Sequence, residues 1–178
     1  MIPNEKEKKQ IKKRSQRMVK LFNSIKGKRM GEFDLKMIPP FTKWLNGKMI
    51  KAERGYIELE FEVRHEMGNP TNLLHGGMQC GMMDDTIGMM TATLGYEGFL
   101  ITLDFHVDYL GKVRIGESVK VIAEMVREGR NVVHTVVEIR NMEETLIAKG
   151  NANLLKTTYT PDYVKEVNQN NKDSINLT

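Results

Sequence analysis

Two adjacent glycines, Gly76 and Gly77, stand where a long apolar segment begins in the stretch NPTNLLHGGMQCGMMDDTIGMMTATLG, residues 69–95. If a helix starts there, its first N–H groups are unpaired and carry the positive end of the helix dipole, and glycine lets a substrate approach them closely. Such donors suit a carbonyl group under nucleophilic attack, whose oxygen gains negative charge. We therefore expect the Gly76 N–H group to be the oxyanion donor, with Gly77 next. The alternative is that the glycines only permit a tight helix entry.

A carboxylate lies further along the same segment. Asp84 could act as a general base on water, or attack the carbonyl carbon to form an anhydride, and the sequence does not separate these roles. A lone helical aspartate is commonly just a solvated side chain. Here the surrounding residues are apolar, so the carboxylate needs a partner or a function. The adjacent Asp85 is the alternative functional carboxylate.

The segment that carries these residues is expected to be a helix over residues 75–95. It is rich in methionine and poor in β-branched residues, and Gly95 is a stop signal. It is apolar on most sides, which predicts that other structure wraps it. The apolar residues are Met78, Met82, Met83, Ile87, Met89, Met90 and Leu94.

Strand-like segments flank this helix at residues 48–53, 56–64, 99–109, 117–127, 131–141 and 144–158. Turns are expected at Arg54-Gly55 and at residues 128–130. Residues 56–64 alternate with Ile57, Leu59, Phe61 and Val63 on one face. Residues 99–109 are predicted to place Phe99, Ile101, Leu103, Phe105, Val107 and Tyr109 on one face, and Thr102, Asp104, His106 and Asp108 on the other. A flat sheet cannot cover a single helix, so we expect an α+β fold with a strongly curved antiparallel sheet around it.

The N-terminal residues differ in character from the rest. The chain holds 27 Lys+Arg and 23 Asp+Glu in 178 residues; residues 1–30 hold 11 and 2 of them, so the other 148 hold 16 and 21. Residues 5–25 are predicted to form an amphipathic helix, with an apolar side of Ile11, Met18, Leu21, Phe22 and Ile25. The favoured interpretation is a helix packed on the domain or on a partner subunit. A membrane-surface or nucleic-acid arm is the alternative.

Composition limits the remaining possibilities. One cysteine, Cys80, excludes an intrachain disulfide framework and fits a reducing cytoplasm. The hydrophilic start does not resemble a secretory signal, and no apolar run is long enough to predict a membrane span. The histidines show no metal-ligand spacing, so we expect neither a metal nor another cofactor. We place the protein in the cytoplasm.

The spacing of the polar residues resembles that of hotdog-fold acyl-CoA thioesterases of the phenylacetate-pathway type. In that family an Asn precedes His-Gly-Gly by six residues, and an Asp follows the His by nine. Here these positions are Asn69, His75-Gly76-Gly77 and Asp84, and this spacing favours Asp84 over Asp85. The family often has Ser or Thr eighteen residues after the Asp, and Thr102 stands there. The resemblance covers about Phe41 to Tyr159.

The resemblance implies hydrolysis of acyl-CoA by a hotdog fold with one long central helix. It divides the chain into a basic helical arm and lead-in (residues 1–46), a hotdog domain (47–160) and a flexible polar tail (161–178). Asn69 would hold the carbonyl oxygen or the attacking water, although a turn residue before Pro70 is an alternative. His75 would orient the loop or contact the thioester, or be a buried structural residue. Thr102 would hold water beside Asp84, or simply favour a strand.

The helix geometry predicts a dimer. The nine residues from His75 to Asp84 rise about 13.5 Å and turn about 180°, so Gly76 and Asp84 of one chain cannot reach one thioester. A two-fold axis that sets two such helices antiparallel would join them in two composite sites, and a dimer of dimers is expected. Gly77, Gly81, Asp84 and Gly88 form a narrow stripe that would allow close approach of a partner helix or substrate.

The acyl-CoA substrate needs cations for its phosphates. Lys112, Arg114, Arg127 and Arg130 are candidates, although a solvated surface role is their alternative. Two further functions stay open. One is a non-catalytic acyl-CoA sensor whose arm binds DNA, which we do not favour, so no nucleic acid is expected. The other is a hotdog hydratase or dehydratase.

Overall fold

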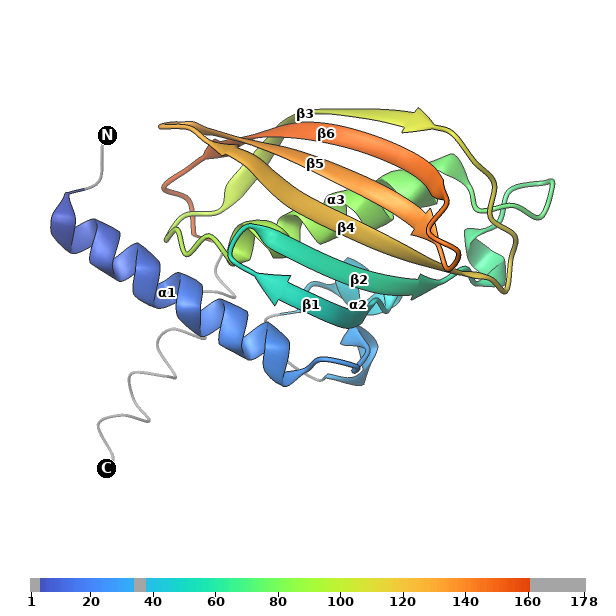
Figure 1. Cartoon of the computed structure of the whole chain (residues 1–178), viewed down its shortest axis with the longest axis horizontal. Coiled ribbons are helices and arrows are strands. Elements are labelled where there is room, and N and C mark those ends of the chain that lie inside the picture. Colours follow the sequence, from blue (N-terminus) through green and yellow to red (C-terminus); the bar gives the residue numbers. More distant parts are fainter. Residues whose placement is uncertain (1–3, 34–37, 161–178) are drawn as a thin grey trace.

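A curved, fully antiparallel sheet wraps one helix in the computed structural model, which describes residues 4–33 and 38–160 (Figure 1). The strand order is β1-β2-β4-β5-β6-β3. The strands are β1 (Lys48–Glu53), β2 (Tyr56–Glu62), β3 (Leu100–Tyr109), β4 (Ser118–Glu128), β5 (Val132–Asn141) and β6 (Leu146–Lys156). The central helix is α3 (Gly76–Ala92). The predicted α+β hotdog architecture is confirmed.

The core lies between the concave face of the sheet and α3. The alternating residues Ile57, Leu59, Phe61 and Val63 are all 0 % exposed, as predicted. They meet the buried apolar residues of α3 and the next turn, which are Met82, Met83, Ile87, Met90 and Leu94. Fully burying one such side chain stabilises the fold by about 1.5–3 kcal/mol. One side of α3 stays open, because Gly77, Asp84 and Ala92 are exposed.

Helix α1 (Glu5–Ser24) lies along the outer side of β1 and confirms the predicted arm helix (Figure 1). It begins with a capping box, in which the Asn4 side chain accepts from the Glu7 N–H group and the Glu7 carboxylate accepts from the Asn4 N–H group. The prediction that Leu21 belongs to the packed apolar side is wrong, because its side chain is 37 % exposed. The other four residues are half-buried, and Ser15 is buried among them.

Short helix α2 (Pro40–Leu45) covers part of α3. It ends at Asn46, which has a left-handed φ of 58°. The Phe41 ring lies over Gly81, where an added Cβ would be 2.9 Å from it. The close neighbour at Gly81 is therefore a helix of the same chain, whereas Gly88 faces open space. The stripe of small residues that was predicted to admit a partner helix or substrate is therefore open at Gly88 but covered by α2 at Gly81.

Strand β3 contains a bulge that reverses its side-chain alternation. Thr102 pairs with Leu154 of β6 and Asp104 with Asn153, so Leu103 is an extra residue. Thr102 and Tyr109 both reach α3 as a result. The predicted strict alternation, which placed Thr102 on the face opposite Tyr109, is wrong for this reason.

Within residues 4–33 and 38–160, none of the helices combines the length and apolar character required to cross a bilayer. The predicted polar tail falls outside the described residues.

Candidate active site

The N-terminal tip of α3 presents one free backbone donor. His75 is the N-cap, and its Nδ1 accepts a hydrogen bond of 2.9 Å from the Gly77 N–H group. In the described part of the chain the Gly76 N–H group has no acceptor. The Gly76 N–H group is therefore free to donate to a ligand, and its role as oxyanion donor stays a prediction. Gly77, the second candidate donor, is not available in this arrangement, because His75 occupies it.

Tyr109 at the end of β3 forms a wall over Gly76. A Cβ added to Gly76 would lie 3.3 Å from the tyrosine ring, and the Tyr109 hydroxyl is 3.2 Å from the Gly76 carbonyl oxygen, to which it donates. The same hydroxyl is 3.0 Å from Cys80 Sγ. The hydrogen bond with Cys80, followed by burial, raises the pKa of Tyr109 to about 12, so the hydroxyl remains a neutral donor. Tyr109 and Cys80 were not predicted as site residues, because they are 29 residues apart and carry no spacing signal.

His75 is exposed, so the alternative of a buried structural histidine is wrong. Because its Nδ1 acts as an acceptor, the neutral ring carries its hydrogen on Nε2. That N–H group can face a bound substrate while the ring holds the first turn of α3.

Asn69 closes its own turn. Its Oδ1 accepts from the Thr71 N–H group at 2.9 Å, from the Thr71 hydroxyl at 2.7 Å and from the Leu73 N–H group at 3.1 Å. This geometry matches the turn alternative for Asn69. Among the described residues the Nδ2 group has no acceptor, so it can still donate to a carbonyl oxygen.

Asp84 lies in the middle of α3 and faces β3. The Thr102 hydroxyl donates to its Oδ1 at 3.2 Å, and both side chains are exposed. The bulge at Leu103 sets this contact, because it turns Thr102 toward the helix. The pair is thus an accessible carboxylate with a hydroxyl that can hold a water molecule beside it.

Asp85, the alternative carboxylate, points elsewhere. It is covered by α2, where the Thr42 hydroxyl donates to its Oδ1. Its Oδ2 is buried and has no partner among the described residues. Burial is the largest cause that raises the pKa of Asp85 to about 6, and the nearby charge of Asp84 adds to it. Asp84, not Asp85, is therefore the carboxylate open to a ligand.

The free amide and the open carboxylate occupy different parts of one chain. Gly76 is beside Tyr109 at the end of β3, and Asp84 is beside Thr102 near its start. Eight residues of helix separate the two by about 12 Å along the axis. A single chain therefore cannot offer both groups to one carbonyl carbon.

The candidate CoA-binding cations are exposed but dispersed. Lys112 and Arg114 follow β3, and an isolated bridge joins Arg114 to Leu73 just before the α3 tip. Arg127 and Arg130 lie at the hairpin between β4 and β5. Near that hairpin the Met125 N–H group donates to the carbonyl oxygen of Gly55, which lies beside Leu94 just after α3. Within one chain the two pairs do not meet.

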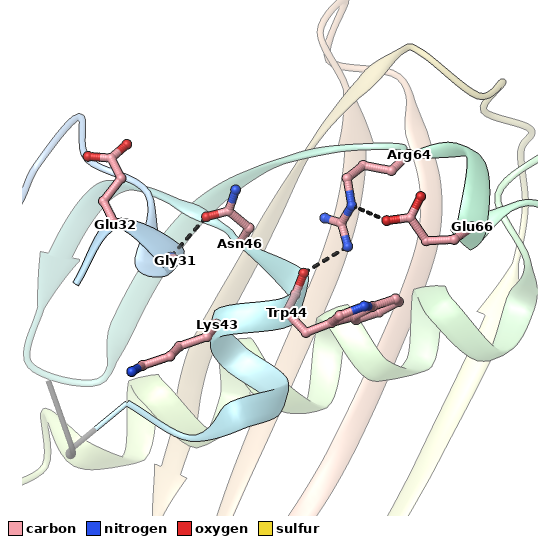
Figure 2. Close-up of a pocket in the computed structure, with 7 residues that line it drawn as sticks. All are labelled: Gly31, Glu32, Lys43, Trp44, Asn46, Arg64 and Glu66. Carbon is pink, nitrogen blue, oxygen red and sulfur yellow. Dashed lines mark hydrogen bonds and ion pairs between the residues drawn. The ribbon is translucent and has the colours of Figure 1, made fainter. Parts of the chain in front are cut away.

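A hollow of about 470 Å³ lies elsewhere, where α2 meets the segment after β2 (Figure 2). The Arg64 guanidinium lies 4.9 Å from the Trp44 ring and donates to the Trp44 carbonyl oxygen at 2.7 Å. None of its lining residues is a candidate catalytic residue, so this hollow is not the site described above. Among the described residues no group of His, Cys, Asp or Glu is arranged to hold a metal ion.

Comparison with known proteins bears on this geometry. Residues 71–148, which include α3 and strands β3 to β5, match the family model of the thioesterase superfamily. This part of the chain is therefore similar to members of that superfamily. Human acyl-coenzyme A thioesterase 13 is 26 % identical over 105 residues, which are 57 % of this chain and 74 % of the human protein.

Solved structures share the same fold. A phenylacetic acid degradation-related protein from Ralstonia eutropha JMP134 is 27 % identical, with a TM-score of 0.61 over 66 % of this chain and 90 % of that one. A Streptococcus mutans protein bound to acetyl CoA is 22 % identical, with a TM-score of 0.61 over 65 % of this chain and 92 % of that one. The arm α1 lies outside the residues matched by the thioesterase-superfamily model.

Proposed function

We propose that this protein hydrolyses acyl-CoA thioesters to a free acid and CoA, at composite sites between two subunits. One observation carries the proposal: within residues that match the thioesterase-superfamily model, the free Gly76 amide and the Asp84–Thr102 pair both lie along α3 beside β3. The human relative named as an acyl-CoA thioesterase and the Streptococcus mutans protein bound to acetyl CoA support acyl-CoA as the substrate class.

The proposed chemistry follows from the positions of the donors. The thioester oxygen accepts from the Gly76 N–H group, where the positive end of the α3 dipole stabilises developing negative charge. In one route Asp84 removes a proton from water held by Thr102, the hydroxide attacks the carbonyl carbon, and the C–S bond breaks to release the acid and the CoA thiolate, which takes the proton from Asp84. In the other route Asp84 attacks the carbonyl carbon itself, the CoA thiolate leaves, and water then hydrolyses the anhydride to the free acid and the Asp84 carboxylate. His75 Nε2 and Asn69 Nδ2 are further donors at the tip. The reaction uses water and groups of the chain, so we propose no cofactor beyond the CoA of the substrate.

The exposed edge of β3 supports a dimer. This strand ends the sheet, so one of its edges has no partner strand in the described chain. It carries exposed apolar side chains at Ile101, Leu103 and Tyr109, and Leu110 follows. A long apolar edge invites pairing with another chain. A two-fold axis near the middle of β3 would set Thr102 and Asp84 of one chain near Tyr109 and Gly76 of the partner subunit.

The same axis would bring the two cation pairs closer together, since each comes from an opposite end of the domain. A dimer of dimers in the cytoplasm remains part of the proposal. The proposed location rests on the single Cys80, and the dimer of dimers rests on exposed apolar side chains away from β3, such as Val126 and Leu155.

The test is hydrolysis of a panel of phenylacetyl, short-chain and long-chain acyl-CoAs, with Asp84→Asn compared against Asp85→Asn. Replacing the open carboxylate should lower kcat by about 10²–10⁴-fold, which is the usual contribution of a general base. Asp85→Asn is the matched control, because it removes an adjacent carboxylate that faces α2. Equal activity in both variants would remove Asp84 from the mechanism. Tight acyl-CoA binding without turnover would favour the sensor, and hydration of an enoyl-CoA would favour the hydratase.

A further inference from the structure

The outer side of α1 carries a line of cations that the proposed reaction does not use. We name it the basic ridge: Lys6, Lys9, Lys13, Arg17 and Lys20. At 100° per residue these positions fall within an arc of about 80° on the helix, and from first to last they span about 21 Å. All five are exposed, and neither acidic residue of α1 falls within that arc.

The ridge cations have no partners in the part of the chain that the structure describes. Among the described residues, none of the five makes a hydrogen bond or an ion pair, whereas Lys8 is bound to Glu5 and Arg14 to the Gly95 carbonyl oxygen. Unpaired like charges on one helix face repel one another, so this arrangement costs stability unless it meets an external anion.

Helix α1 is held in place, so the ridge has a fixed direction. Arg14 Nε donates to the Gly95 carbonyl oxygen at 2.8 Å, and Asn23 Nδ2 donates to the Ala52 carbonyl oxygen at 2.8 Å. The apolar side, with Ile11 and Phe22, packs on the domain at the opposite side of the helix. Figure 1 shows α1 as the outermost element beside β1. The ridge is therefore turned away from the domain.

We propose that the basic ridge binds the surface of membranes that contain anionic phospholipids. Clusters of four to eight Lys and Arg on an amphipathic helix suit anionic headgroups, which attract each such cation independently of sequence. A straight outward ridge can touch a flat surface along its whole length. The apolar side of α1 is already buried, so the attachment is electrostatic, without insertion, and salt weakens it.

The composition of the ridge favours headgroups over nucleic acid. Four of its five cations are lysines, which act as point charges, whereas specific recognition of nucleic acids favours the planar fork of arginine. The exposed side of α1 has no aromatic residue on which a base could stack. Nucleic-acid binding is accordingly an outcome that the experiment tests against.

The experiment is co-sedimentation of the full chain with vesicles of phosphatidylserine and phosphatidylcholine, or of phosphatidylcholine alone, at low and high salt. The ridge variant is Lys9→Gln with Lys13→Gln. Its control is Lys51→Gln with Lys149→Gln, which removes the same charge from exposed sites on the sheet. Each removed ridge charge should weaken binding about fivefold, so the ridge variant should bind roughly 25-fold more weakly than the wild type. The control should stay near the wild type.

Several results would overturn the proposal. They are equal binding to both kinds of vesicle, equal loss in the ridge and control variants, or binding to duplex DNA or RNA in preference to vesicles. A change in oligomeric state in the ridge variant would instead make the ridge a subunit contact. Binding is measured without acyl-CoA, and hydrolysis of a soluble short-chain acyl-CoA is measured separately. Failure of membrane binding is therefore distinguishable from failure of the proposed hydrolysis.

Discussion

Among single residues, Gly76 offers the sharpest test of the oxyanion donor. It is the first residue of α3, a position where proline is well tolerated and only the N–H group is lost. The preceding His75 has φ −64° and ψ 138°, which suits a residue before proline. Gly76→Pro should therefore lower kcat by about 10²–10³-fold while the helix remains intact. Steady-state kinetics with circular dichroism measures both.

Gly76→Ala is the matched control, because it keeps the N–H group and adds only a Cβ. That atom would lie 3.3 Å from the Tyr109 ring, a tight contact that a small movement of the ring relieves. The alanine variant should lose much less activity than the proline variant. Equal losses would mean that crowding of Tyr109, rather than the missing donor, accounts for the effect.

The sequence predicted which residues to consider at this site but not how they are used. Helix entry at Gly76 and the spacing to Asp84 follow from local pattern, and the structure places Asp84 beside Thr102. The engagement of Gly77 by His75 depends on one side-chain rotamer. The contacts of Tyr109 with Gly76 and Cys80 depend on how β3 packs on α3, which no local pattern reveals.

At the scale of elements, the contact between α2 and α3 should make stability depend on pH. Burial shifts the pKa of Asp85 from an ordinary 3.8 to about 6. The folded state thus binds a proton more tightly than the unfolded state, so this contribution is fully present below about pH 4 and is lost as pH rises through about 6. Above that pH the buried anion costs up to about 3 kcal/mol, since one pKa unit is 1.36 kcal/mol.

Asp85→Asn should remove this dependence. The amide keeps an oxygen that can accept from Thr42 but cannot ionise. Relative to the wild type, the variant should gain up to about 3 kcal/mol of unfolding free energy near pH 8 and nothing near pH 4. Urea unfolding at both pH values measures this. A gain that is the same at both pH values would show that packing, not charge, is responsible.

Periodicity predicted the elements themselves. The arm helix, α3 and the six strands were expected within a few residues of their bounds, because each has an apolar repeat bounded by turn or stop signals. The sequence could not predict which residues of β3 share a face of the sheet. The bulge that shifts them depends on the hydrogen-bond register with β6 rather than on the residues of β3 alone. That one extra residue decides whether Thr102 faces α3 or solvent.

At the scale of the whole molecule, the composite site makes opposite predictions for two mixed dimers. In a dimer of an Asp84→Asn chain and a Gly76→Pro chain, one site combines both defects and the other combines intact Gly76 with intact Asp84. In a dimer of a wild-type chain and a chain with both substitutions, each site has one defect. Isologous symmetry therefore gives the first dimer about half the activity of the wild type and the second dimer almost none.

Two different affinity tags on co-expressed chains allow each mixed dimer to be purified and assayed per dimer. If each chain instead held a complete site, the result would reverse: the wild-type chain in the second dimer would keep about half of the activity, and the first dimer would be inactive. The comparison needs no assumption about acyl preference, since both dimers meet the same substrate. It separates a site shared between subunits from one within a subunit, because the two arrangements exchange their outcomes.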